Sequence, residues 1–373
     1  MPCFCPVTAH YITAPLVNAL IASYINIRLN IHAKQLSSQV SPNTVTPHRI
    51  KDFTLMLLSF AMVALGLTLL ALGGDVLVRS SVSIARTVRM STFLTGVLVV
   101  GFGTSAPELL VSLDAAYRGK PDIAVGNVVG SNIANILLIL GLAAFIAPIA
   151  CSARVIKRDI LVTLAASFIL LGLGLTGQIT RPAGLLMLAI MAGYIIFIIS
   201  HDGAQDPGQG RAQNRIDLHD DDQSQSRLLR AVVMFVISVV MLAVGADWLV
   251  EGAATIARTM GVSEAIIGLS LVAIGTSLPE LAAAVMAATR RQTDLIIGNV
   301  LGSSLFNILV ILGLTALITP LPVAPRMATT DLPISIVVLV LLGLLVRLTP
   351  RLTRRHGIAF TALYAGYSVL LLA

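Results

Sequence analysis

The two residues best suited to chemistry are glutamates that stand inside long apolar runs. Glu108 ends the stretch Gly-Thr-Ser-Ala-Pro-Glu, and Glu280 ends the stretch Gly-Thr-Ser-Leu-Pro-Glu. A carboxylate at bilayer depth costs several kcal/mol and usually serves ion or proton movement. The alternative is a buried hydrogen bond between helices or an ion pair with arginine. Because the glutamate recurs beside a proline in both places, we favour the functional interpretation.

Oxygen-bearing side chains accompany both glutamates. Hydroxyls stand within one helical turn before each of them, and a second pattern, Gly-Asn-x-x-Gly-Ser-x-x-x-Asn, follows each Pro-Glu pair. Its serine and last asparagine are four positions apart and share one helix face. The oxygen-bearing side chains of the two patterns are Thr104, Ser105, Glu108, Ser131, Asn135, Thr276, Ser277, Glu280, Ser303 and Asn307. An oxygen set without His or Cys is typical of a hard cation such as Ca²⁺, and two carboxylates could instead be shared among Na⁺ ions and a proton.

The prolines predict how backbone oxygens reach the same site. A proline inside a helix lacks an N–H and kinks the helix, so Pro107 and Pro279 should release carbonyls about four residues upstream, near Gly103 and Gly275. The first asparagine of the second pattern, Asn127 or Asn299, could brace the kinked helices. The predicted metal set also includes Gly101 and Ala273, which occupy matching positions.

These motifs belong to two copies of one sequence pattern. Matched residues stand 172 positions apart, as Glu108 and Glu280 do. Asp75 and Asp247 match at the same offset, but they lie near helix ends, where we favour interfacial or capping roles. The matched residues are largely Gly, Thr, Ser, Pro, Glu and Asn, so shared hydrophobicity cannot explain the pattern. Repeats of this kind in secondary transporters meet near the bilayer midplane, where substrate binds.

The elements that position these residues are predicted to be membrane-spanning helices. The chain has 373 residues, of which 56% are hydrophobic and 12% charged, with a mean hydropathy of +0.91. We therefore predict an all-α polytopic membrane protein with ten transmembrane helices in two repeats of five. An odd number per repeat inverts the second repeat. The expected spans are 53–78, 91–117, 124–148, 159–177, 182–200, 228–250, 263–289, 296–319, 332–347 and 357–373.

The predicted organisation has four parts. Residues 1–52 form an N-terminal extension that we expect to be disordered, with an eleventh helix there as the less favoured alternative. The first repeat covers 53–200 and the second 228–373. Lys and Arg concentrate in the loops after the odd-numbered helices, which by the positive-inside rule places the 201–227 loop in the cytoplasm. We expect a prokaryotic plasma (inner) membrane protein.

Several other classes of function are disfavoured. The net charge of +7 is spread over single basic residues between apolar runs, so no nucleic-acid surface is expected. The three cysteines lack metal-site or disulfide spacing. The acidic residues of 217–222 lack EF-hand spacing and predict a solvated loop. We expect that the protein is not an enzyme, binds no cofactor and has no obligate protein partner. The species expected to interact with it are membrane lipid, Ca²⁺ and Na⁺.

The paired motifs resemble the alpha repeats of the cation/calcium exchanger superfamily, in its bacterial sodium/calcium exchanger branch. The resemblance covers residues 53–373. It implies exchange of Ca²⁺ for Na⁺ by alternating access, with the second, third, seventh and eighth helices forming the site and the first and sixth sliding across it. It also implies a set of cation ligands made of Thr104, Ser105, Glu108, Ser131, Asn135, Thr276, Ser277, Glu280 and Ser303, with Asn307 at a further ligand position. In several archaeal and potassium-dependent members an Asp replaces Asn307, so potassium dependence is not expected here. A Ca²⁺/H⁺ antiporter and, less favoured, a cation channel are the alternatives.

Overall fold

The structure, a computed structural model, describes residues 48–151, 153–202, 221–262, 267 and 273–372. The chain divides into a unit of residues 1–55 and a unit of residues 56–373, which holds every predicted site residue. The predicted extension, 1–52, lies outside the described residues except for 48–52. The account below concerns the second unit, together with the helix that enters it.

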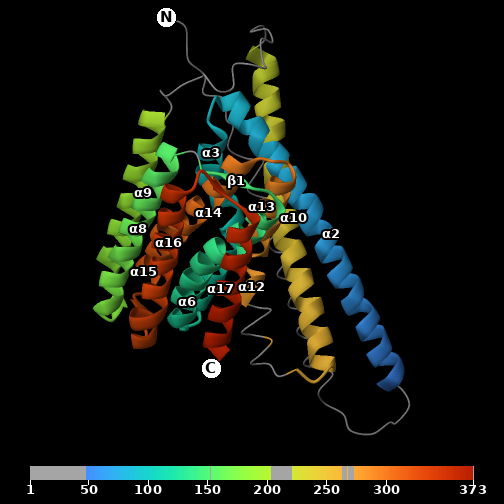
Figure 1. The fold of residues 1–373 in the computed structure, drawn as a ribbon. Coiled ribbons are helices and arrows are strands. Elements are labelled where there is room, and N and C mark those ends of the chain that lie inside the picture. Colours follow the sequence, from blue (N-terminus) through green and yellow to red (C-terminus); the bar gives the residue numbers. More distant parts are fainter. Residues whose placement is uncertain (1–47, 152, 203–220, 263–266, 268–272, 373) are drawn as a thin grey trace, which may run out of the picture. The chain divides into compact units, whose positions relative to one another are not determined.

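The described chain is built almost entirely from helices (Figure 1). The first repeat contains α2 (His48–Val88), α3 (Thr92–Thr95), η1 (Gly96–Val100), α4 (Gly101–Thr104), α5 (Ala106–Tyr117), α6 (Pro121–Ala134), η2 (Asn135–Ile139), α7 (Leu140–Ile146), β1 (Ile149–Ala150), α8 (Ala153–Leu175), β2 (Gln178–Ile179) and α9 (Arg181–Asp202). The second contains α10 (Asp221–Thr259), α12 (Ala273–Gly275), α13 (Leu278–Thr289), α14 (Thr293–Phe306), η4 (Asn307–Ile311), α15 (Leu312–Ile318), β3 (Leu321–Pro322), η5 (Met327–Asp331), α16 (Leu332–Leu348), β4 (Arg351–Leu352) and α17 (Arg354–Leu372). The η segments are π-helical turns.

The two repeats are built alike and interlock. The elements α5, α6, η2, α7 and β1 begin and end 172 positions before α13, α14, η4, α15 and β3. Their contacts are reciprocal, because α7 packs on α17 while α15 packs on α9. Antiparallel pairing joins β1 to β4 and β2 to β3, so each two-residue strand pairs with a strand of the other repeat. The site therefore lies in a frame that both repeats build.

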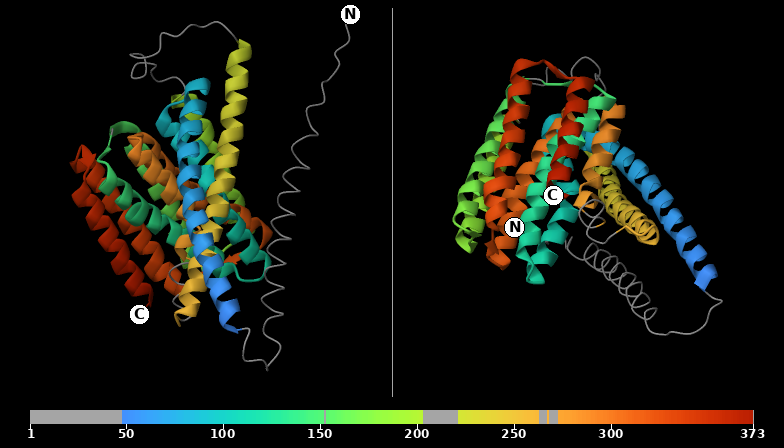
Figure 2. Two further views of the ribbon diagram at one scale, coloured as in Figure 1. Left: turned by 90° about the vertical axis from the view of Figure 1, so that its right-hand side faces the viewer. Right: turned by 60° about the horizontal axis from the view of Figure 1, so that its bottom comes forward.

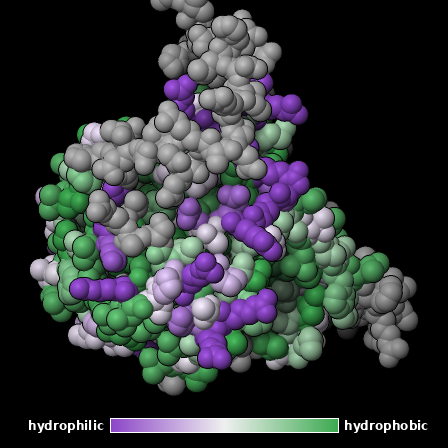
Figure 3. Space-filling model, turned by 45° about the horizontal axis from the view of Figure 1, so that its top comes forward, coloured by the Kyte–Doolittle hydropathy of each residue, from purple (hydrophilic) through white to green (hydrophobic). Residues whose placement is uncertain are grey.

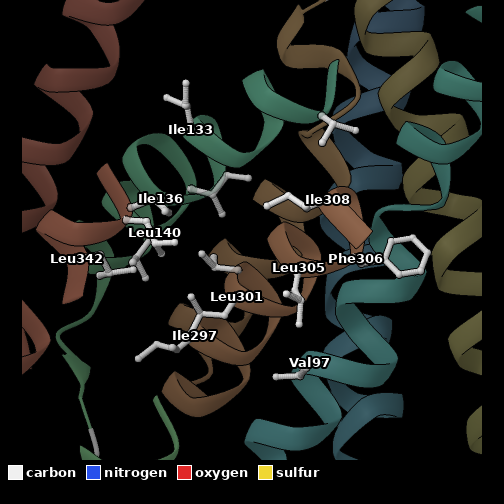
Figure 4. Packing of buried hydrophobic residues seen from close by; sticks show 14 of the residues in the cluster. Val97, Ile133, Ile136, Leu140, Ile297, Leu301, Leu305, Phe306, Ile308 and Leu342 are labelled. Atoms are coloured by element: carbon white, nitrogen blue, oxygen red, sulfur yellow. The ribbon is translucent and has the colours of Figure 1, made fainter. Parts of the chain in front are cut away.

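Helix α14 lies at the centre of this frame. Its apolar residues pack against η1, α6, η2 and α7, and Figure 4 labels side chains of all these elements around α14. In the span from α14 to α15, 94% of an 18-residue apolar segment is buried inside the protein. The corresponding segments of α2 and α10 are 17% and 22% buried. The two long helices instead present exposed apolar side chains, as a lipid-facing surface would.

Helices α2 and α10 cross at close range (Figure 2). A Cβ placed on Gly66 of α2 would lie 2.7 Å from the Gly245 carbonyl oxygen of α10, and one on Gly252 would lie 2.7 Å from the Ser59 carbonyl oxygen. Glycine is thus required for these backbones to approach each other, as at small-residue crossings of membrane helices.

The described residues contain seven helices that are long and apolar enough to span a membrane, or eight if the bent pair Thr92–Thr104 and Ala106–Tyr117 is one span. This is fewer than the predicted ten. Of the predicted span 263–289, residues 263–266 and 268–272 lie outside the described ranges, and the rest holds α12 and the 12-residue helix α13. Helix α17 fills the predicted span 357–373 but begins with two arginines and a histidine, which lower its hydropathy. Helices α9 and α10 also extend into the predicted 201–227 loop. Hydrophilic residues gather at one end of the molecule in Figure 3.

Candidate cation site

Each predicted glutamate stands at the start of a new helix. Helix α4 ends at Thr104 and α5 begins at Ala106, with a bend of 42° between the segments on either side of Ser105. Pro107 lies in the first turn of α5, where its missing N–H costs nothing. The predicted kink at Pro107 is confirmed as this bend, and the helix ends and restarts there rather than running on through the proline. A helix N-terminus is also a favourable place for a carboxylate.

The second repeat has the same construction. Ser277 lies between α12 and α13 with φ −89° and ψ 4°, close to the φ −81° and ψ 6° of Ser105. Pro279 and Glu280 then occupy the first turn of α13. Because both helices restart at the same motif position, the two carboxylates are presented by equivalent backbone.

The structure brings Glu108 and Glu280 together across the repeats. Both side chains are buried, each about 1% exposed. The Ser105 hydroxyl donates to Oε1 of Glu280 at 3.1 Å. Within the described ranges, neither carboxylate oxygen of Glu108 meets hydrogen-bond geometry, and the Ser277 hydroxyl and the Glu280 carboxylate are among its electrostatic neighbours. Two acidic groups thus share one buried place without a basic side chain between them among the described residues.

Hydroxyl and amide groups join the broken helices reciprocally. The Thr104 hydroxyl donates to Oδ1 of Asn299 at 3.3 Å, and the Thr276 hydroxyl donates to Oδ1 of Asn127 at 3.3 Å. The Asn127 amide also donates to the backbone carbonyl of Glu108 at 3.3 Å. The predicted brace by these asparagines is confirmed. Asn299 joins the second motif of its repeat to the broken helix of the first repeat. Asn127 joins the second motif of the first repeat to the broken helices of both repeats.

The serines of the second motif complete the wall of the site. Ser277 donates to Ser131 at 3.2 Å, and Ser303 lies 3.4 Å from the Gly101 carbonyl oxygen. That carbonyl also accepts from the Ser105 backbone N–H at 3.2 Å, so it already has two donors inside the protein. The matching residue, Ala273, begins α12.

The last asparagines of the motif, Asn135 and Asn307, begin the π-helical turns η2 and η4. Such turns are frequent at functional sites. Both side chains are buried, and several of their polar atoms have no hydrogen-bond partner within the described part of the chain. The buried atoms without such a partner in this region are Oε1 and Oε2 of Glu108, Oε2 of Glu280, both amide atoms of Asn135, Nδ2 of Asn299 and Oδ1 of Asn307.

Unpaired buried oxygens require an explanation, and an ion is one of the usual ones. Five of the seven atoms named above are oxygens, and a cation among them would satisfy those oxygens. The described residues contain no cluster of three or more His, Cys, Asp or Glu side chains. The donor set is therefore two carboxylates with neutral oxygens, which suits Ca²⁺ or Na⁺ rather than a softer metal.

Three asparagines in this region were outside the predicted ligand set. Asn127 and Asn299 match each other in the two repeats and were predicted as braces. Asn132 was not predicted, because its counterpart in the second repeat is Ser304. Asn132 and Asn299 are buried. Comparison of the two repeats therefore identifies polar residues that both repeats contain, and it misses a polar residue that only one of them contains.

Known proteins resemble this chain over most of its length. The protein CaxA of Alkalimonas amylolytica is 36% identical over 329 residues, which cover 85% of this chain and 99% of CaxA. The inner membrane protein YrbG of Escherichia coli (strain K12) is 33% identical, with 82% of this chain and 94% of YrbG covered. The similarity thus covers nearly the whole length of a protein named as an inner membrane protein.

The fold is similar to solved structures of the sodium-calcium exchanger NCX_Mj. One of them matches with a TM-score of 0.72 and 32% sequence identity, covering 83% of this chain and 97% of that exchanger. The family model described as sodium/calcium exchanger protein matches residues 58–200 and 230–373. These two ranges lie within the predicted repeats, 53–200 and 228–373. The exact boundaries of the repeats remain predictions. The chain belongs to the sodium/calcium exchanger protein family, which is a family of transmembrane antiporters.

Proposed function

We propose that the protein is a secondary antiporter that exchanges Ca²⁺ for Na⁺ by alternating access and exports Ca²⁺ from the cytoplasm. The observation that carries the proposal is the pair of buried glutamates, Glu108 and Glu280, whose oxygens are largely without hydrogen bonds within the described residues. The family membership and the oxygen-only surroundings support the same function. The neutral oxygens of Thr, Ser and Asn residues around the pair would complete the coordination of the ion.

Charge explains why exchange should be coupled. Two carboxylates can neutralise one Ca²⁺ or be balanced by Na⁺ ions, whereas an empty site leaves two unpaired charges away from water. Burying unpaired charge is costly, so the empty protein should resist changing its exposed face. Only an ion-loaded protein would then move between the two faces. This coupling through charge is what an antiporter requires.

Everted membrane vesicles test the coupling ion. An outward Na⁺ gradient should drive uptake of ⁴⁵Ca²⁺, and collapse of the pH gradient with nigericin in K⁺ medium should leave that uptake unchanged. Vesicles that carry Glu280→Gln, prepared in parallel, control for leak and other transporters. Uptake that follows the pH gradient and ignores Na⁺ would replace the proposal with a Ca²⁺/H⁺ antiporter.

A reporter fusion tests the orientation of the protein in the membrane. We place the 201–227 loop in the cytoplasm because Lys and Arg concentrate on its side. A reporter that is active only in the cytoplasm should be active when it is fused within that loop, and a reporter that is active only outside should be inactive there. An external reporter signal at this position would reverse the predicted orientation of both repeats.

A further inference from the structure

Asn132 is a buried polar residue whose role does not follow from the repeat. It lies on α6 beside Ser131 and is 6% exposed. Among the polar positions of the second motif, this is the one at which the halves differ, since the second repeat carries Ser304. A difference at this place makes the two halves of the site unequal.

Both ends of the Asn132 amide are engaged across the repeats. Its Nδ2 donates to the backbone carbonyl of Ser304 at 3.2 Å, and its Oδ1 accepts from Nδ2 of Asn307 at 3.1 Å. A backbone carbonyl can only accept, so the nitrogen of Asn132 must face it and the oxygen must face the other way. That oxygen in turn requires the nitrogen of Asn307.

The orientation of Asn307 is thereby fixed. Its nitrogen is bound to Asn132, and its Oδ1 is left buried without a hydrogen bond within the described ranges. A flipped Asn307 would set two oxygens against each other at Asn132 and put an N–H donor where the free oxygen now lies. The contact with Asn132 therefore keeps an oxygen, rather than an amide N–H, available to a cation.

The other half lacks this device among the described residues. Neither amide atom of Asn135 has a hydrogen-bond partner there. The Ser304 hydroxyl, at the position that matches Asn132, donates at 2.8 Å to the Val300 carbonyl of its own helix. Asn135 can thus present either its oxygen or its nitrogen, while Asn307 is held in one orientation.

We propose that Asn132 is a positioning residue that makes Asn307 an oxygen ligand for the transported cation. This inference rests on the proposed function, because it assigns Asn307 to the same ion site. It acts on cation affinity rather than on the rate of the conformational change. Asn132 itself does not contact the ion.

The experiment compares initial rates of ⁴⁵Ca²⁺ uptake in everted vesicles over a range of Ca²⁺ concentrations. Asn132→Ser should raise KM for Ca²⁺ about fivefold, the factor that corresponds to one hydrogen bond of ordinary net strength. The maximal rate per folded protein should stay within about twofold. Ser304→Ala is the matched control and should leave KM unchanged, because that hydroxyl donates to the Val300 carbonyl of its own helix.

A double-mutant cycle separates positioning from a general structural effect. In an Asn307→Ala background, Asn132→Ser should have no further effect on KM, since the residue it orients is gone. An equal rise in KM in both backgrounds would overturn the proposal, as would no rise in the single variant. If Asn132→Ser does not accumulate in the membrane, Asn132→Ala takes its place. Absence of Ca²⁺ uptake by the unmodified protein would count against the proposed function instead.

Discussion

Gly302→Ala should separate the central helix of the site from its neighbour. Gly302 on α14 faces the backbone of Val97 in η1. A Cβ added there would lie 2.5 Å from the Val97 carbonyl oxygen and 2.6 Å from its Cα, whereas ordinary contact begins at 3.4 Å. The obstructing atoms are backbone atoms, so no side-chain rotation can relieve the overlap. The helix must therefore move away by roughly 0.9 Å.

The expected cost follows from two opposing effects. Overpacking a close contact costs about 1–3 kcal/mol, and a backbone obstruction belongs at the upper end of that range. Alanine recovers about 1 kcal/mol because it favours helix over glycine. The free energy of unfolding should thus fall by about 2 kcal/mol. Ca²⁺ uptake should fall as well, because Ser303, the next residue, loses its 3.4 Å approach to the Gly101 carbonyl.

Gly172→Ala on α8 is the matched control. No heavy atom of a described residue lies within 4 Å of a Cβ at Gly172, so this variant should be at least as stable as the unmodified protein. Unfolding of the purified variants in mixed SDS and detergent micelles measures the stability, and ⁴⁵Ca²⁺ uptake in vesicles measures the activity. The reasoning is refuted if Gly302→Ala matches Gly172→Ala in both assays.

Three further substitutions test individual contacts. Ser105→Ala removes a donor to Glu280 and should raise KM for Ca²⁺ uptake at least about tenfold, since hydrogen bonds to charged groups are worth about 1.5–3 kcal/mol; an unchanged KM would contradict the assigned contact. Glu280→Asp withdraws the carboxylate by one methylene, so equilibrium ⁴⁵Ca²⁺ binding should weaken but remain measurable, and complete loss would show that charge alone is insufficient. Asp75→Asn removes the partly exposed ion pairs with Arg79 and Arg290 and should lower the free energy of unfolding by about 1 kcal/mol in the micelle assay, with Asp114→Asn, on a single and more exposed pair, as the smaller control.

The sequence predicts the shared features of the site well. The offset of 172 between Glu108 and Glu280 is reproduced by helix bounds that match residue for residue in α5 and α13. Polar residues with fixed spacing in an apolar background carry this information, because membrane burial leaves few reasons to keep them. Repetition then indicates that they act together.

What the sequence does not predict depends on contacts between the repeats. The two-residue strands pair residues about 200 and 140 positions apart, and no local pattern marks them. The π-helical turns at Asn135 and Asn307 follow from packing around the site. The role of Asn132 depends on a neighbour from the other repeat. Seven or eight of the ten predicted spans are found in the described residues. The span 263–289 lies partly outside the described ranges, and α17 begins with charged residues that lower its hydropathy.

The most direct test of the account is equilibrium binding of ⁴⁵Ca²⁺ to the purified protein, titrated with Na⁺. The unmodified protein should bind Ca²⁺ and release it as Na⁺ rises, with K⁺ at equal ionic strength as the control. Glu108→Gln and Glu280→Gln should each abolish this binding, because either change leaves one carboxylate to balance a divalent ion. Undiminished Ca²⁺ binding by both variants, with the fold intact, would contradict a cation site built on the two glutamates.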